Sequence, residues 1–148
     1  MFFAPFFKKL FPRKGIKPLQ MSKATAGPIR ILLVEREDYV RTSIKKLLEN
    51  SFEVVDFRCE FDAVEYVKRN TVDLAILSDD LFENINGASL LLSLRKNCKK
   101  TFRAFALISQ LSDAQRNYLI TAGFEDIICK PVKFPDFSDL VYFRKASS

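Results

Sequence analysis

The chain has 148 residues, of which 48% are apolar and 13% aromatic, enough to bury the core of one soluble domain. It contains no histidine, which excludes hydrolases that depend on a histidine base and metal sites built on imidazole. Its formal charge of +6 arises entirely before residue 29, because the 18 basic residues that follow balance 18 acidic ones, so no nucleic-acid partner is expected.

Residues 1–28 are predicted to form a basic, Phe-rich extension, disordered or tethering, in front of a domain at residues 29–145. Five apolar residues fall near one side of a short helix: Phe3, Phe6, Phe7, Leu10 and Phe11. Pro5 and Pro12 limit that helix to about two turns. Residues 1–20 could bind an anionic membrane surface or a groove on a partner protein. The alternative is a natural start at Met21, in which case they have no role.

The first half of the domain alternates strands with helices. "RILLV", Arg30 to Val34, is typical of a strand buried on both faces, and Glu37 or Asp38 can cap the helix that follows. That helix carries an apolar face of Val40, Ile44, Leu47 and Leu48. "EVVDF" predicts the second strand, and the second helix has an apolar stripe of Phe61, Val64 and Val67.

The second half continues the alternation. "DLAIL", from Asp73, predicts strand three, and a helix with Leu90, Leu91 and Leu94 begins near Ala88. "AFALIS" predicts strand four, and "SDAQ", Ser112 to Gln115, matches a capping box for a helix ending near Gly123. "DIIC" predicts strand five, and a last helix is expected with Phe137, Leu140 and Val141 on its inner face.

This alternation predicts an α/β fold with a parallel sheet, helices on both faces and right-handed crossovers. In such folds, sites form beyond the carboxyl ends of the strands. That rule brings together six residues, namely Glu35, Arg36, Ser78, Asp79, Ser109 and Lys130.

Cysteine spacing and hydropathy indicate a cytoplasmic protein, with the extension allowing a peripheral place at the inner membrane face. Cys59, Cys98 and Cys129 are odd in number and contain no C-x-x-C pair, so free thiols are expected. No apolar run approaches the roughly 20 residues that span a bilayer. The opening residues carry their basic residues within and after the apolar stretch, unlike a secretory signal.

The ordered set "ILLVEREDYVR", "DLAILSDD", "NINGASLL", "ALIS" and "AGFEDIICKPV" resembles the receiver domain of bacterial response regulators, over Arg30 to about Phe143. The resemblance implies a flavodoxin-like, CheY-like (βα)5 sandwich with a five-stranded parallel sheet in strand order 2-1-3-4-5. It also implies a pocket in which two acids after strand one hold Mg²⁺ and an aspartate ending strand three accepts a phosphoryl group from a kinase histidine.

The candidate pocket departs from that family pattern. Ser109 and Lys130, followed by Pro131, match the residues that respond to the phosphoryl group, and Glu35 matches the first acid. Arg36 stands where the second acid is expected, and a cation there opposes Mg²⁺. Ile127 replaces the aromatic residue often found three positions before the lysine. The candidate metal ligands are therefore Glu35 and Asp79, in doubt because of Arg36.

Two residues compete for the acceptor position. Counting forward from Ala63 with the family's spacing reaches Ser78, whereas counting back from Gly87 reaches Asp79. One residue has been inserted, either before strand three or in the loop after it. A serine cannot form an acyl phosphate, so the two placements predict different chemistry.

The leading hypothesis is a stand-alone, atypical receiver that is not an enzyme, needs no cofactor and binds a signalling protein, such as a sensor histidine kinase. Phosphorylation would be weak or absent. The alternative is a phosphoacceptor that uses Asp79 with Mg²⁺ in a two-component phosphorelay. A flavin- or nucleotide-binding protein is disfavoured because "EREDY" after strand one is acidic and would repel phosphate.

Overall fold

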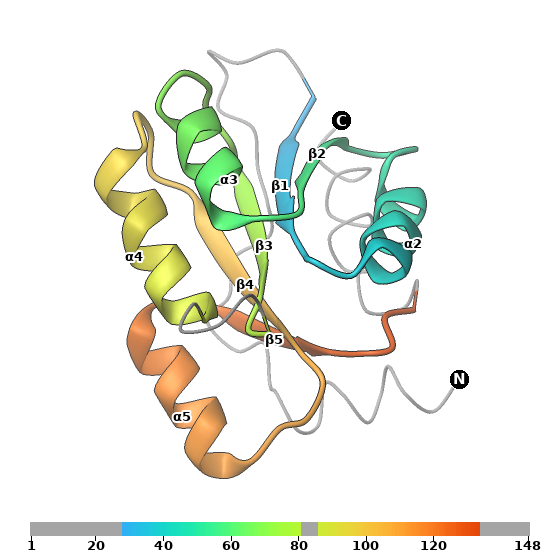
Figure 1. The fold of residues 1–148 in the computed structure, drawn as a ribbon, viewed down its shortest axis with the longest axis vertical. Coiled ribbons are helices and arrows are strands. Elements are labelled where there is room, and N and C mark those ends of the chain that lie inside the picture. Colours follow the sequence, from blue (N-terminus) through green and yellow to red (C-terminus); the bar gives the residue numbers. More distant parts are fainter. Residues whose placement is uncertain (1–27, 81–85, 134–148) are drawn as a thin grey trace.

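The computed structural model describes residues 28–80 and 86–133, which form a parallel sheet in the order β2-β1-β3-β4-β5 (Figure 1). The strands are β1 (Arg30–Val34), β2 (Glu53–Phe57), β3 (Leu74–Ser78), β4 (Arg103–Ile108) and β5 (Asp126–Cys129). All four neighbouring pairs are parallel. The predicted fold and strand order are confirmed, and the strand boundaries differ from the expected ones by at most one residue.

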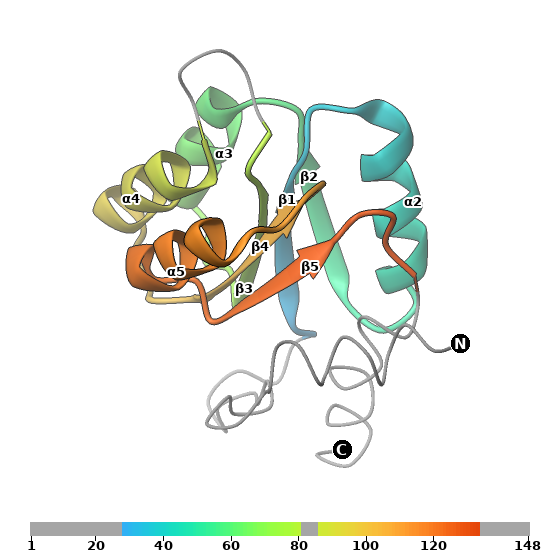
Figure 2. The ribbon, with the colours of Figure 1, turned by 90° about the horizontal axis from the view of Figure 1, so that it is seen from below.

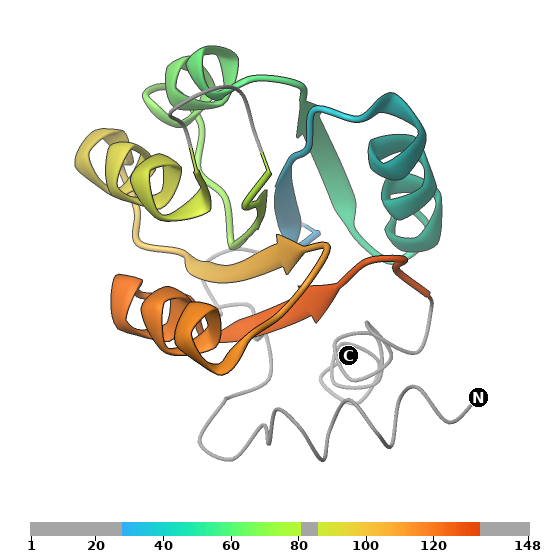
Figure 3. The ribbon, with the colours of Figure 1, turned by 60° about the horizontal axis from the view of Figure 1, so that its bottom comes forward.

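Helices cover both faces of this sheet (Figures 2 and 3). They are α2 (Asp38–Leu48), α3 (Glu60–Val67), α4 (Gly87–Asn97) and α5 (Asp113–Ala122). Helix α2 lies on one face, whereas α3, α4 and α5 lie on the other. The expected last helix lies outside the described residues. No helix in the described part of the chain is long and apolar enough to cross a membrane.

Two apolar layers separate the sheet from its helices, and strand residues alternate between them. The α2 layer contains Ile31 and Leu33 of β1, Leu74 and Ile76 of β3, Phe105 and Leu107 of β4, and Ile128 of β5. The opposite layer contains Leu32, Val34, Ala75, Leu77, Ala104, Ala106, Ile108 and Ile127, packed against α3, α4 and α5. The side chain at each strand position therefore faces one of the two layers. The same alternation determines the side to which the residues at the strand ends point.

The stripe predicted for α3 is wrong at Phe61, which is 70% exposed. Helix α3 instead buries Ala63 and Val67, with Val64 partly buried. Phe61 belongs to the first turn of α3 and lies off the face that Ala63 and Val67 bury in the core. Residues three apart, such as those of the predicted stripe, also drift around a helix. The buried face of α3 instead has the i, i+4 spacing of Ala63 and Val67.

The ends of α5 follow the sequence signals only in part. The Ser112 side chain accepts a hydrogen bond from the backbone N–H of Gln115, at 3.1 Å, as a capping residue should. Gly123 adopts a left-handed conformation at the end of the helix, with a φ of 116°. The Gln115 side chain, however, donates to Asp79 at 3.0 Å instead of returning to the cap, so the capping box is only half formed.

Candidate functional site

The residues just beyond the strand ends still form the backbone hydrogen bonds of the sheet. Their side chains therefore continue to alternate between its two faces. The backbone N–H groups of Glu35, Asp79 and Lys130 donate to carbonyl oxygens of the neighbouring strands, at 3.1, 2.9 and 2.7 Å. Glu35 therefore shares the face of Leu33, Ser78 that of Ile76, and Lys130 that of Ile128. Asp79 shares the opposite face with Leu77. The two acceptor candidates consequently point to opposite sides of the sheet.

Glu35, Ser78 and Lys130 form a polar cluster on the α2 side of the sheet edge. The ammonium nitrogen Nζ of Lys130 lies 2.6 Å from Oε1 of Glu35 and donates to Oγ of Ser78 at 3.4 Å. Glu35 is only 1% exposed and Ser78 is fully buried. Oε2 of Glu35 also accepts the Glu37 backbone N–H at 2.8 Å. The cluster thus pairs its buried carboxylate and its ammonium directly with each other.

The Asp79 carboxylate has different partners, all on the opposite side of the sheet. Oδ1 accepts the backbone N–H of Gly87 at 3.1 Å, at the first residue of α4. Oδ2 accepts Nε2 of Gln115 at 3.0 Å, in the first turn of α5. We call this pair of hydrogen bonds the Asp79 bridge.

Two of the remaining candidates are exposed residues close to strand ends, and the third is buried. Arg36 is exposed after Glu35, and Ser109 is exposed directly after β4. Ile127 is buried on β5, at 1% exposure. The Lys130–Pro131 peptide bond is cis.

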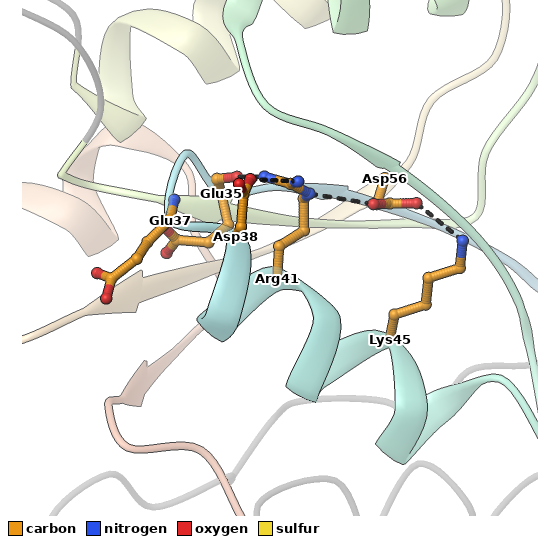
Figure 4. A network of polar contacts seen from close by, with 6 residues as sticks. All are labelled: Glu35, Glu37, Asp38, Arg41, Lys45 and Asp56. Carbon is orange, nitrogen blue, oxygen red and sulfur yellow. Dashed lines mark hydrogen bonds and ion pairs between the residues drawn. The ribbon is translucent and has the colours of Figure 1, made fainter.

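Arg41 was not among the residues singled out from the sequence, although it organises the loop after β1 (Figure 4). Its guanidinium donates to Asp56 of β2 at 3.1 Å, to the Glu35 carbonyl at 2.9 Å and to Asp38 at 2.7 Å. The hydrogen bond from Arg41 lowers the pKa of Asp38, with a further contribution from the charge of Arg58. The only sequence signal was the three-residue spacing between Asp38 and Arg41, which is common on exposed helix surfaces.

The described residues do not fit the Mg²⁺ of a phosphoacceptor pocket. Hard divalent cations need several oxygen ligands, usually including more than one carboxylate. In the described ranges, no group of three or more His, Cys, Asp or Glu side chains is arranged to hold a metal ion. The carboxylate of Glu35 is neutralised by Lys130, and that of Asp79 is directed to the other face of the sheet.

A five-stranded parallel sheet with polar residues at the carboxyl ends of β1, β3 and β5 defines a flavodoxin-like α/β protein. Residues 31–142 match the model of the response regulator receiver domain family, which is most of the chain, and the chain belongs to this family. It is a receiver domain of two-component signalling, as the sequence resemblance indicated.

Solved structures agree on the fold. A CheY-like response regulator receiver domain protein from Methanospirillum hungatei is 20% identical, with a TM-score of 0.68 over 82% of this chain and 100% of its own. A response regulator from Thermotoga maritima is 21% identical, with a TM-score of 0.66 over 82% and 98%. The chemotaxis protein CheY4 of Vibrio cholerae is 16% identical, with a TM-score of 0.67 over 82% and 100%. A comparison with curated proteins gives no match.

Proposed function

We propose that this chain is an atypical receiver, a pseudo-receiver, that signals by binding a partner protein and whose phosphorylation is weak or absent. The observation that carries this proposal is the direction of two neighbouring side chains. Ser78 faces Lys130 and Glu35, whereas Asp79 turns to α4 and α5. These directions support Ser78 at the acceptor position, with the inserted residue in the loop between β3 and α4.

The chemistry of the pocket supports the same conclusion. An acyl phosphate requires a carboxylate nucleophile, and the Ser78 hydroxyl cannot supply one. In a receiver, the lysine provides positive charge for the phosphoryl oxygens. Here Glu35 already holds the Lys130 ammonium at 2.6 Å, so an incoming phosphoryl group would have to compete with a buried ion pair. The pocket is neutral without phosphate and stays in one state.

A receiver with a constant pocket acts through its surface. On α5, Tyr118 is 52% exposed and Ile120 is 43% exposed, and aromatic side chains are enriched at protein interfaces. We assign partner binding to α5, β5 and the segment that follows, with a cytoplasmic signalling protein such as a sensor histidine kinase as the partner.

Phosphate incorporation is the experiment that tests this proposal. The full-length protein is incubated with Mg²⁺ and acetyl phosphate, and its intact mass is compared with those of Ser78→Ala and Asp79→Ala variants. We expect no phosphate on any of the three. A receiver with an intact aspartate and metal site serves as the positive control under the same conditions.

The alternative function, a Mg²⁺-dependent phosphoacceptor, predicts a different pattern. Wild type would gain one phosphate that hydroxylamine removes, and Asp79→Ala would lose it while keeping its circular dichroism spectrum. That result would overturn the pseudo-receiver proposal. A phosphate that survives hydroxylamine and disappears in Ser78→Ala would overturn it as well, in favour of modification on the serine.

A further inference from the structure

Asp79 connects the end of the sheet to two helices, through its backbone and its side chain. Its backbone N–H donates to Leu107 of β4, so the residue is fixed at the end of the sheet. From there, one carboxylate oxygen reaches α4 and the other reaches α5. Hydrogen bonds to an ionised group are about twice as strong as neutral ones. A half-buried carboxylate with two such bonds is well suited to hold both helices.

The contact with α5 replaces a local hydrogen bond by a long-range one. Gln115 is the third residue after the capping Ser112, where a capping box would direct its side chain back to the cap. Its amide instead reaches a residue 36 positions earlier in the chain. Ser112 still accepts the backbone N–H of Gln115, so the first turn of α5 is held on two sides.

The contact with α4 depends on a glycine. The N-terminus of a helix favours a negative charge, and Asp79 places its carboxylate there. A Cβ atom at Gly87 would lie 3.3 Å from the Ser78 carbonyl oxygen and 3.4 Å from Oδ1 of Asp79. A side chain at this position would therefore push the start of α4 away from the carboxylate.

From this geometry we infer that Asp79 is a positioning residue that holds α4 and α5 against the end of β3. The Asp79 bridge fixes the position of the α5 surface without a phosphoryl group. This inference rests on the proposed function, because it explains how a receiver without phosphorylation keeps its binding surface in one arrangement. Attack by the carboxylate on phosphorus would also draw it away from its helix contacts.

Hydrogen exchange of the full-length protein tests the bridge directly. The amides to follow are those of Gly87 and Leu90 on α4 and of Gln115 and Arg116 on α5. We expect Asp79→Ala to raise exchange roughly tenfold at both helix starts, because the hydrogen bonds lost involve a charged group. Gln115→Leu should raise it only on α5. Asp79→Asn, which keeps an acceptor for Gly87 and can pair with the Gln115 amide, should stay close to wild type.

Gln110→Leu is the matched control, because Gln110 is an exposed glutamine between β4 and α5. It should leave exchange unchanged. The double variant Asp79→Ala, Gln115→Leu should exchange on α5 no faster than Asp79→Ala alone, since both changes remove the same bond. Unchanged exchange at Gln115 and Arg116 in both single variants, with the fold intact, would overturn the inference.

These outcomes are separate from those of the phosphorylation experiment. Wild type that incorporates phosphate while Asp79→Ala loosens both helices would remove the pseudo-receiver proposal and leave the bridge standing. If wild type stays unmodified while Asp79→Ala changes no exchange rate, the pseudo-receiver proposal stands and the Asp79 bridge is overturned. Gln115→Leu keeps the test valid if Asp79→Ala fails to fold, because Gln115 is only partly buried on the first turn of α5.

Discussion

At the scale of single residues, the ion pair between Glu35 and Lys130 decides the character of the pocket. Glu35 is almost completely buried, and its charge is compensated by the ammonium 2.6 Å away. Removing one member of a buried pair leaves the other charge uncompensated, which costs much more than the pair itself contributes. The pair therefore contributes little net stability, although each partner needs the other to remain buried as a charged group.

The Lys130→Met variant should lower the free energy of unfolding by about 3–5 kcal/mol, because Glu35 would remain buried without a counter-charge. Adding Glu35→Gln should recover most of this loss, since the amide can still accept the Glu37 N–H. Urea denaturation of the three proteins gives the measurement. Lys99→Met, at an exposed lysine, is the control and should change stability by less than about 0.5 kcal/mol. Equal losses in the single and double variants would contradict the pairing.

The sequence placed Glu35, Ser78 and Lys130 at one sheet edge but left Ser78 and Asp79 as equal candidates for the acceptor. The reason is the burial of β3, whose five residues are all buried. A strand that is apolar on both faces shows no alternation, so its pattern does not tell which residue after it turns to which side. Only the packing of Ile76 against α2 and of Leu77 against the opposite helices separates them.

At the scale of secondary-structure elements, the amino ends of the strands are joined by side chains that the sequence analysis did not single out. Asp73, just before β3, accepts the backbone N–H of Arg30 at 2.9 Å and pairs with Lys100 at 3.0 Å. The Arg30 guanidinium in turn pairs with Glu53 of β2 at 3.0 Å. The two residues of each contact are 23 to 43 positions apart in the sequence, so no local sequence pattern could reveal these contacts.

We expect Asp73→Ala to destabilise the protein by about 1–3 kcal/mol, because the Arg30 N–H loses its side-chain acceptor at the start of β1. Asp73→Asn should cost less, since the amide oxygen can still accept that N–H. Urea denaturation at low and moderate salt gives both values, and only the part due to Lys100 should decrease with salt.

The matched control for Asp73 is Glu65→Ala on α3. Glu65 pairs with Lys68 at 2.7 Å, but both side chains are more than 40% exposed. An exposed pair three residues apart contributes about 0.5 kcal/mol or less. A larger loss for Glu65→Ala than for Asp73→Ala would show that Asp73 does not join the strands.

The apolar pattern predicted the buried face of α2 correctly but assigned one residue of α3 to the wrong face. The residues of α2 that were expected to face the sheet include its two buried ones, Ile44 and Leu48. Phe61 followed the same spacing in α3 and is exposed. The apolar residues of α3 alone do not fix which side of the helix faces the sheet, because Ala63 and Val67 define a buried face that leaves Phe61 outside it.

At the scale of the whole molecule, the charge is divided between a neutral domain and a basic extension. The six basic residues that account for the formal charge of +6 precede residue 29, outside the described residues. In the described domain, many of the charged side chains form ion pairs across the strand ends and helix surfaces. Electrostatic attraction to an anionic surface would therefore have to come from the extension.

Tethering by residues 1–20 predicts that full-length protein binds vesicles containing anionic lipid and that a chain beginning at Met21 does not. Each basic residue near such a surface contributes about 1 kcal/mol, and burial of the phenylalanines adds to it. Co-sedimentation at low and at moderate salt measures both effects. The full-length chain should pellet at low salt and less at moderate salt, because the charge contribution is screened.

Two variants separate charge from burial in this tethering. Replacing Lys8 and Lys9 by glutamate should abolish binding mainly at low salt, whereas replacing Phe6 and Phe7 by serine should weaken it at both salt concentrations. Both variants leave the described domain untouched, so its thermal unfolding should be unchanged. Equal sedimentation of the full-length and shortened chains would exclude a membrane role for residues 1–20. Docking to a partner protein would then require that binding of that partner depends on residues 1–20 even when no lipid is present, and partner binding that does not depend on them would leave these residues without a role.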